Sequence, residues 1–370
     1  MMIYCKTCLY PNTKPDLLFD SEGVCSACRA YEARKNINWS DSAMMFNQMA
    51  QAHDILYPNK YNCIVPVSGG KDSTYQIEKV KSYGLRPLAV NVRTCDLSEL
   101  GRRNLNNISL LGNDLVEVVP NQRLRRHINR YALETIGDIS WPEHVLIFTV
   151  PVIVAKEKNI PLIIWGENPQ NEYGGPKEWQ DQSELIAKRW LSEFGGLNGL
   201  RVTDVQDSLD CSDSDMCYYK YPSDVSDIRQ IFLGSYFEWD GLKNAKFAKE
   251  NGFEFSEFPV EGSGYNYENL DNYHTGLHDY FMYLKYGFGR ATGITNTLIR
   301  RGKMIRAEGV SHVRKWDGQY PSDYLGKHLV RILAPLEMKL SDFDKIVRQF
   351  ANKELFDVSG SRPIPKFKVN

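Results

Sequence analysis

The chain has no long hydrophobic run: no stretch of about 18 consecutive apolar residues occurs anywhere in its 370 residues. Its N-terminus lacks the apolar segment of a secretory signal peptide. Neither an internal repeat nor a low-complexity tract is visible. We therefore expect a cytoplasmic protein without a membrane span.

Neither sign of charge is in excess. The 45 Lys and Arg residues nearly balance the 46 Asp and Glu residues, for a net charge of −1. Because a nucleic-acid-binding face is usually basic, this balance argues against a nucleic-acid partner. Hydrophobic content of 42% and charged content of 25% are those of an ordinary soluble globule. The length suits one large α/β domain with additions, or two domains.

The chain also lacks a Walker A phosphate-binding loop. That motif requires a glycine where Val65 stands and a serine or threonine where Asp72 stands. Present instead is Ser68-Gly-Gly-Lys-Asp-Ser73, between an apolar run at 62–67, expected to be a strand, and a helix-compatible run at 74–83. Strand, Gly-Gly turn and helix together aim backbone N–H groups at an anion.

This hexapeptide resembles the PP-loop, S-G-G-x-D-S, of the ATP pyrophosphatase superfamily, which includes GMP synthetase, asparagine synthetase, argininosuccinate synthetase and tRNA thiolation enzymes. The resemblance implies that ATP is split between its α and β phosphates and that a carbonyl-type oxygen is adenylated. Gly69 and Gly70 leave no Cβ between backbone and phosphate, and Lys71 adds a mobile charge. A chance glycine-rich turn is the alternative.

Four cysteines near the N-terminus form two C-x2-C pairs separated by 16 residues, which is a zinc-ribbon spacing. A closed set of four thiolates leaves no coordination site for water, so we assign the zinc a structural role. Disulfides are the alternative, disfavoured in a reducing compartment, and an iron–sulfur cluster is another. The predicted metal ligands are Cys5, Cys8, Cys25 and Cys28.

The other four cysteines are weaker signals. Cys63 lies inside the first expected strand and is interpreted as a small core residue. Cys95 follows the second strand, where a bystander role is favoured over a contact with nucleotide. Cys211 and Cys217 stand in a polar stretch and stay open as reactive thiols, which a thiolation enzyme would need near its ATP site.

Apolar strand patterns alternate with helical ones along the chain. This alternation predicts an α/β fold with a doubly wound parallel sheet, preceded by a zinc ribbon and followed by a mainly helical region. The expected domains are 1–32, 33–235 and 236–370. The expected strands are 62–67, 87–92, 115–119, 160–165 and 231–232, and the expected helices are 74–83, 98–111 with Ser98 as N-cap, 124–133, 145–154 around Pro151 (alternatively a strand), and a terminal helix with a capping-box-like start at Ser341.

Ligands of such sheets bind beyond the carboxyl ends of the strands. Those ends are Val67, Val92 and Trp165, the last leading into a loop rich in Gly, Asn and Glu. In that loop Glu167 or Asn168 is a candidate for binding Mg²⁺ or ribose, although a solvated acidic turn is the alternative. The predicted ATP-binding residues are Ser68, Gly69, Gly70, Lys71, Asp72, Ser73, Asn91, Val92, Gly166 and Asn168.

The C-terminal third interleaves aromatic and polar residues. His274 and His278 are four residues apart, and we interpret them as ordinary helix residues rather than metal ligands. Arginines in this region suit an acidic substrate or phosphates, because guanidinium groups bind such groups in bidentate fashion. A solvated helix face is the alternative. The substrate candidates are Glu172, Tyr173, Gly174, Gly175, Arg290, Arg300 and Arg301.

Five segments together resemble the N-acetyl sugar amidotransferase family of lipopolysaccharide and flagellin-glycan synthesis. They are 5–15, 65–75, 165–168, 172–175 and 285–292. The resemblance implies that an acetamido group on an acidic N-acetyl sugar, of the sugar-nucleotide or nonulosonic acid type, becomes an acetamidino group. It further implies a glutaminase subunit and a cyclase-like barrel subunit, both similar to subunits of imidazole glycerol phosphate synthase.

The chemistry follows from the amide itself. An amide oxygen is a poor leaving group, but its adenylation lets AMP depart when ammonia attacks the carbon. The protein must position ATP, stabilise pyrophosphate and exclude water. We expect Lys71 to stabilise pyrophosphate, with Asp72 and Glu167 as Mg²⁺ or orienting residues, so these three are the predicted catalytic residues. Mg²⁺ itself is inferred from ATP chemistry.

The chain shows no glutaminase. Position 2 is Met rather than an N-terminal nucleophilic cysteine, and no cysteine outside the metal set lies in a Gly-flanked nucleophile elbow. Ammonia must therefore come from solution or from a partner. The leading alternative function is a tRNA thiolation enzyme with zinc-binding cysteines, and a third is a non-catalytic nucleotide-binding scaffold.

Overall fold

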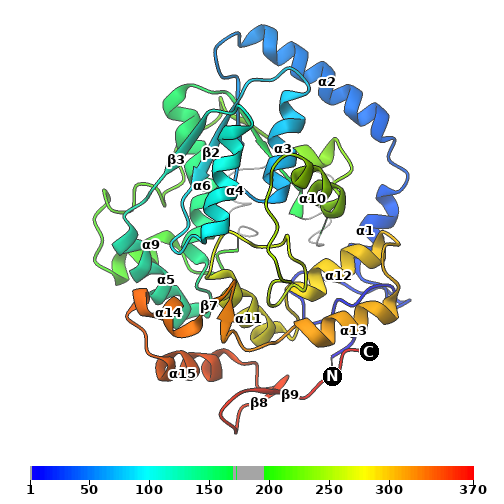
Figure 1. Ribbon diagram of the computed structural model, residues 1–370, viewed down its shortest axis with the longest axis vertical. Coiled ribbons are helices and arrows are strands. Elements are labelled where there is room, and N and C mark those ends of the chain that lie inside the picture. The colour runs from blue at the N-terminus through cyan, green and yellow to red at the C-terminus, as the bar shows by residue number, and fades with distance from the viewer. Residues whose placement is uncertain (1, 170–171, 173–195) are drawn as a thin grey trace.

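The computed structural model describes residues 2–169, 172 and 196–370, and its centre is a five-stranded parallel sheet (Figure 1). The strand order is β3-β2-β1-β4-β5, so the chain winds outward from β1 in one direction and then resumes on the other side of it. The crevice between β1 and β4 is therefore the topological switch point, where ligands of such sheets bind. The strands are β1 Cys63–Pro66, β2 Pro87–Val92, β3 Leu115–Val118, β4 Leu162–Trp165 and β5 Arg229–Phe232.

Helices cover both faces of the sheet, because the central strands are apolar on both sides. Ile64 packs into the core under α5 and α6, while its neighbour Val65 packs into the core under α2, α3 and α4. Burial on both faces confirms the predicted doubly wound α/β class. These helices are α2 Trp39–Leu56, α3 Lys71–Lys81, α4 Glu99–Leu110, α5 Gln122–Ile136, α6 Trp141–Lys158 and α10 Gly241–Glu250, which packs on α3.

All five expected strands and the expected helices up to α6 are confirmed, with boundaries shifted by a few residues. Ser98 caps α4 as predicted, its side chain accepting from the Gly101 N–H at 2.8 Å. Pro151 lies inside an unbroken α6, so the helical interpretation was right. The expected start of the terminal helix was wrong: α15 (Leu340–Phe350) has Lys339 as its N-cap, without a side-chain cap, because Ser341 already lies inside the helix.

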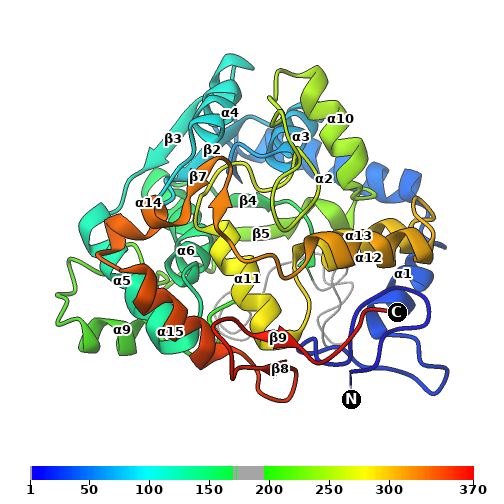
Figure 2. The ribbon, with the colours of Figure 1, turned by 60° about the horizontal axis from the view of Figure 1, so that its bottom comes forward.

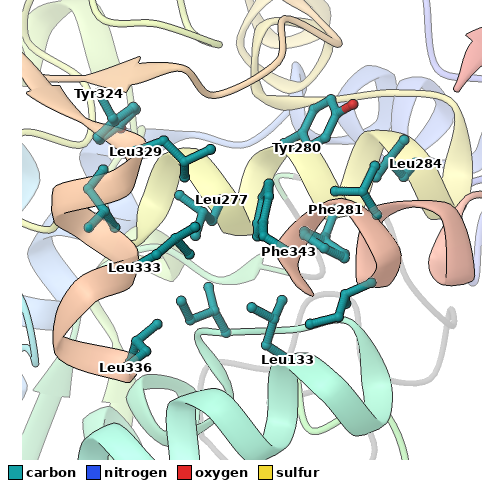
Figure 3. Packing of buried hydrophobic residues seen from close by; sticks show 14 of the residues in the cluster. Leu133, Leu277, Tyr280, Phe281, Leu284, Tyr324, Leu329, Leu333, Leu336 and Phe343 are labelled. Atoms are coloured by element: carbon teal, nitrogen blue, oxygen red, sulfur yellow. The ribbon is translucent and has the colours of Figure 1, made fainter. Parts of the chain in front are cut away.

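The C-terminal region is mainly helical, as predicted, and shares its core with α5. Figure 3 shows Leu133 of α5 facing Phe281 and Phe343, which come from α11 and α15. The helices are α11 Thr275–Tyr286, α12 Arg290–Arg300, α13 Arg306–Trp316, α14 Leu329–Leu333 and α15, with hairpins β6–β7 (Asp323–Tyr324, Lys327–His328) and β8–β9 (Phe356–Asp357, Ile364–Pro365). A short helix, α9 (Val202–Ser208), contributes Val205 to the core formed with α5 and α6. None of the described helices is long and apolar enough to cross a membrane.

The N-terminal cysteine module, with α1 (Ser26–Arg34), packs on the C-terminal helices, and both chain termini lie on that side (Figure 2). Leu9 donates its backbone N–H to Asn296 Oδ1 at 2.6 Å, and Thr13 donates to the Tyr286 carbonyl at 2.6 Å. The ring of Tyr10 meets Phe288 edge-on at 5.8 Å between centroids. Residues from opposite ends of the sequence therefore form one small core.

Candidate functional site

The PP-loop leaves β1 and turns sharply into α3. Gly69 has φ +84°, and a Cβ there would lie 2.7 Å from the backbone of Leu105 in α4, so only glycine fits. Gly70 is the N-cap of α3, and Ser68 Oγ accepts its N–H at 3.1 Å. The first turn of α3 begins in residues that line cavities beside the strand ends. Because the first N–H groups of a helix have no acceptor within the helix, this end attracts anions.

Alanine at Gly69 is expected to lower the free energy of unfolding by about 1–3 kcal/mol, because left-handed strain and the contact with Leu105 act together. Thermal denaturation measures this loss. Gly84→Ala is the matched control, since Gly84 has φ +81° but no atom within 4 Å of its added Cβ. Equal losses in the two variants would contradict a close approach at the loop.

Lys71 is buried in a network of charges that the loop sequence alone does not disclose. Its ammonium lies 2.6 Å from Asp72 Oδ2 and 3.0 Å from Glu268 Oε1. Asn244 of α10 donates to Asp72 Oδ1 at 2.7 Å. Burial lowers the pKa of Lys71, but the two carboxylates outweigh burial and raise it above its usual value. Lys71 is therefore a fixed cation beside the loop.

The carboxyl ends of β1, β2 and β4 open into a cavity of about 540 Å³, which we call the strand-end cavity. Asn91 donates to the Val67 carbonyl at 2.7 Å, yet its buried Oδ1 and the buried Thr94 Oγ1 have no hydrogen-bond partner within the described structure. Such orphaned polar atoms suit a polar ligand. Six predicted ATP-binding residues line this cavity: Ser68, Asp72, Ser73, Asn91, Val92 and Gly166.

A second cavity, of about 590 Å³, lies between the cysteine module, α10 and α11–α12, and we call it the helical cavity. Tyr10 and Lys14 of the module contribute to its wall. Burial lowers the pKa of Lys14 to about 8. The two cavities share the lining residues Asp72, Glu167, Trp239, Asn269 and Arg290.

The predicted substrate residues separate into different environments. Arg290 lines both cavities and pairs with Asp279 at 2.8 Å. Arg301 lines the helical cavity, but its guanidinium pairs with Glu172 at 2.9 Å. Tyr173, Gly174 and Gly175 lie outside the described residues.

Glu172 is held from two sides, since Arg34 of α1 also pairs with its carboxylate at 2.8 Å. Arg300 donates to the Glu172 backbone carbonyl at 2.6 Å. This buried cluster ties α1 and α12 to the loop after β4. Asn168 and Arg300 are buried, and neither is one of the described residues that line the two cavities.

The four N-terminal cysteines come together as a metal site. Their sulfurs all lie within 4.8 Å of one another, with Cys5–Cys28 at 3.9 Å and Cys8–Cys25 at 3.7 Å. Four sulfurs bound tetrahedrally to zinc at about 2.3 Å are about 3.8 Å apart, so the cluster fits one zinc ion. The separations exceed the disulfide bond length of about 2.05 Å, and all four cysteines are free thiols.

The remaining cysteines do not provide an evident reactive thiol. Cys63 is fully buried in β1, as expected of a core residue. Burial raises the pKa of Cys95 to about 12, which keeps that thiol protonated. Burial likewise raises the pKa of Cys211, while Cys217 is exposed. None of the described residues lining the strand-end cavity is a cysteine.

Sequence reasoning missed the residues that approach the loop from distant segments. Glu268 and Asn244 reach Lys71 and Asp72, and Tyr10 and Lys14 reach the helical cavity from the metal module. The interleaved aromatic and polar residues around Glu268 were the available signal. That pattern indicated a functional region but did not identify Glu268 as the residue that pairs with Lys71.

Comparison with known proteins gives two likenesses. Residues 254–367 match the family described as "LPS biosynthesis protein WbpG-like, C-terminal domain". Among solved structures, NMN synthetase from Francisella tularensis is similar, with 11% sequence identity and a TM-score of 0.30 over 60% of this chain and 99% of that chain. No curated protein matches the chain.

Proposed function

We propose that the protein is an ATP-dependent, AMP-forming amidotransferase that converts an acetamido group of an acidic N-acetyl sugar into an acetamidino group. The observation that carries this proposal is the junction of two cavities beside the PP-loop. Asp72, Glu167 and Arg290 line both cavities. A nucleotide in the strand-end cavity would there meet a second substrate in the helical cavity. The likeness of 254–367 to a lipopolysaccharide-biosynthesis family supports a sugar substrate.

Adenylation in this proposal takes place at the junction. The amide oxygen attacks the α-phosphate, and pyrophosphate leaves toward the PP-loop, where Lys71 and the backbone N–H groups of α3 stabilise its charge. A cavity of about 110 Å³ lined by 68–72 and 268–271 adjoins the loop and suits the departing pyrophosphate. Ammonia then attacks the activated carbon and displaces AMP. The proposed reaction requires water to be kept from the activated carbon, because hydrolysis would regenerate the amide.

The residues at the loop suit a magnesium ion carried by ATP. Mg²⁺ is typically held by one or two carboxylates together with substrate phosphates and water. Asp72 and Glu167 at the junction are the proposed protein ligands, and Glu268 beside Lys71 is a third carboxylate nearby. When bound, the ion would neutralise phosphate charge. The zinc at the four cysteines would hold the N-terminal module that forms one wall of the helical cavity.

The helical cavity suits an acidic acceptor. Lys14, Arg290 and Arg301 place three basic side chains on its wall, but Arg290 is paired with Asp279 and Arg301 with Glu172. We therefore propose Lys14 as the first contact of the acidic group, with a guanidinium joining it by exchanging its carboxylate partner for the substrate in bidentate fashion. Tyr10 and Phe288 add aromatic surface for a sugar ring. The wall therefore combines the two features that an anionic sugar requires.

The decisive experiment incubates the purified protein with ATP, Mg²⁺, ammonium and a panel of acetamido sugars that differ in the acidic group. Mass spectrometry should find a product about one mass unit lighter than one substrate, because oxygen is replaced by NH, together with AMP and pyrophosphate. ADP and phosphate as products would contradict the proposal. If AMP and pyrophosphate formed but no amidine did, the protein would adenylate an acceptor other than the acetamido group.

Glutamine is expected not to replace ammonium in the isolated protein. None of its cysteines outside the metal site shows a nucleophile-elbow sequence, so we propose that a glutaminase subunit and a cyclase-like barrel subunit supply ammonia. The measurement is amidine formation with glutamine while free ammonia is removed enzymatically. An added glutaminase partner should restore the use of glutamine. Product formation by the isolated chain at the ammonium rate would contradict the partner hypothesis.

A further inference from the structure

His278, on the wall of the strand-end cavity and apart from the PP-loop, pairs with a buried carboxylate. His278 of α11 has its Nδ1 2.8 Å from Asp138 Oδ1, and Asp138 is 2% exposed. The same carboxylate accepts from the Ser140 N–H at 2.9 Å and from Asn198 Nδ2 at 3.0 Å. Its position is thus fixed by three groups. A carboxylate at Nδ1 holds the imidazole with its proton on that atom and leaves the lone pair on Nε2.

A second imidazole completes the cluster. The ring of His144, from α6, meets the His278 ring edge-on at 5.2 Å between centroids. His144 Nδ1 lies 3.3 Å from the Gly196 carbonyl and 3.8 Å from Asp138 Oδ2. Both imidazoles line the strand-end cavity, and so does Arg290.

The cluster lies where the two cavities approach each other. Gly196 and Asn198 line the helical cavity, and they are the groups that contact His144 and Asp138. Arg290, which pairs with Asp279 next to His278 in the sequence, lines both cavities. A base at this place faces the region where an activated acceptor would meet its nucleophile.

The charges around His278 favour proton uptake there rather than at His144. Burial lowers the pKa of His278, but the charge of Asp138 and its hydrogen bond outweigh burial and raise it above its ordinary value. Asp279 adds to this increase and Arg290 opposes it. Burial lowers the pKa of His144. When the two imidazoles together take up one proton, it therefore binds to His278 rather than to His144.

We propose that His278, oriented by Asp138, is the general base that accepts a proton from the attacking nitrogen. This inference rests on the proposed amidine-forming function. The nitrogen lone pair forms a C–N bond to the adenylated carbon, and the nitrogen becomes cationic. His278 Nε2 takes one of its protons, and cleavage of the C–O bond releases AMP with the oxygen and the bonding electron pair. The proton then passes from His278 to solvent, and no redox change occurs. Asp138 acts as a positioning residue.

The test separates adenylation from nitrogen transfer. His278→Gln should reduce amidine formation about 100-fold, the lower end of general-base contributions, while isotope exchange between ATP and pyrophosphate in the presence of the sugar stays within about twofold of wild type. His127→Gln is the matched control, because His127 is an exposed residue of α5. This control should leave both rates unchanged.

Asp138→Asn tests the positioning role through the pH profile, measured at constant free ammonia. The rate should rise with pH as His278 loses its proton. Without the Asp138 charge the pKa of His278 falls, so the rising limb should move to lower pH while the maximal rate decreases. NMR titration of His278 should show the same shift, and it needs no substrate.

Three results would overturn the inference. His278→Gln could form amidine within threefold of wild type, it could lose exchange and amidine formation equally, or Asp138→Asn could leave the His278 titration unmoved. Failure of the proposed function looks different: wild-type protein would form no amidine from any sugar. In that case the NMR titration still decides whether Asp138 controls His278.

Discussion

Replacing Lys71 by methionine is expected to slow AMP formation about 10²–10³-fold, which corresponds to about 2.7–4 kcal/mol of lost transition-state stabilisation. Lys71 is a buried, charged donor 2.6 Å from Asp72 and 3.0 Å from Glu268, next to the loop N–H groups. Methionine preserves most of the aliphatic packing and removes the charge. The measurement is AMP and pyrophosphate production at saturating ATP. Asp72→Asn should also lower the rate, since it alters a residue that lines both cavities.

Lys243→Met is the matched control for Lys71→Met. Lys243 belongs to α10, which packs on α3, the helix that holds Lys71. The side chain of Lys243 is exposed and pairs with Glu238 at the surface. Exposed pairs of this kind contribute little to stability or activity. A Lys71→Met protein that is folded by circular dichroism and still as fast as wild type would contradict the assigned role of the PP-loop.

The Cys25→Ser, Cys28→Ser double variant is expected to lose its zinc and about several kcal/mol of stability. Structural zinc supplies on the order of 10 kcal/mol to small modules of this kind, and the cysteines account for four of the eight buried residues in the core cluster that the module forms with Phe288. With about 2.1 cal/mol/K of unfolding entropy per residue, a chain of 370 residues shifts by about 1.3 °C per kcal/mol, so thermal denaturation should move by roughly 5 °C. Metal content is measured on the same protein by mass spectrometry.

Cys217→Ser is the control for the metal site, because Cys217 is exposed and distant in sequence from the four ligands. It should retain stoichiometric zinc and an unchanged melting temperature. Stoichiometric zinc in the double variant would show that the four cysteines are not the ligands. If the purified protein instead showed the optical absorption of an iron–sulfur cluster, the metal at this site would be iron rather than zinc.

Features that depend on local sequence were predictable. β1 and α3 follow from an apolar run, two glycines and a helical pattern that are contiguous, and the cysteine cluster follows from two C-x2-C pairs whose spacing reflects knuckle geometry. Ser98 caps α4 because a serine placed just before a helix can accept a hydrogen bond from a backbone N–H of the first helical turn. Ser341 carries a similar signal, yet the helix begins one residue before it, since boundaries respond to packing as well as capping.

Partners across the fold were not predictable. Asn244 reaches Asp72 over 172 residues of sequence, and a single sequence records the charge of a residue but not the group that donates a hydrogen bond to it. Arg301 and Glu172 were both predicted as substrate residues, and the fold pairs them with each other, which their positions in the sequence do not disclose. The helical position of His278 was predicted from sequence. Its carboxylate partner was not, because Asp138 lies 140 residues away and approaches His278 only in the fold.

The packing of the cysteine module on the last third of the chain has a consequence for biosynthesis. Leu9 and Thr13 dock on Asn296 and Tyr286, so these residues leave the ribosome more than 270 residues before their partners do. Domains generally fold as units during translation, N-terminal first. Here the module must wait, with Tyr10 exposed, until α11 and α12 emerge. Early metal capture would keep the nascent module compact during that interval, and a chain interrupted before residue 286 would never bury Tyr10.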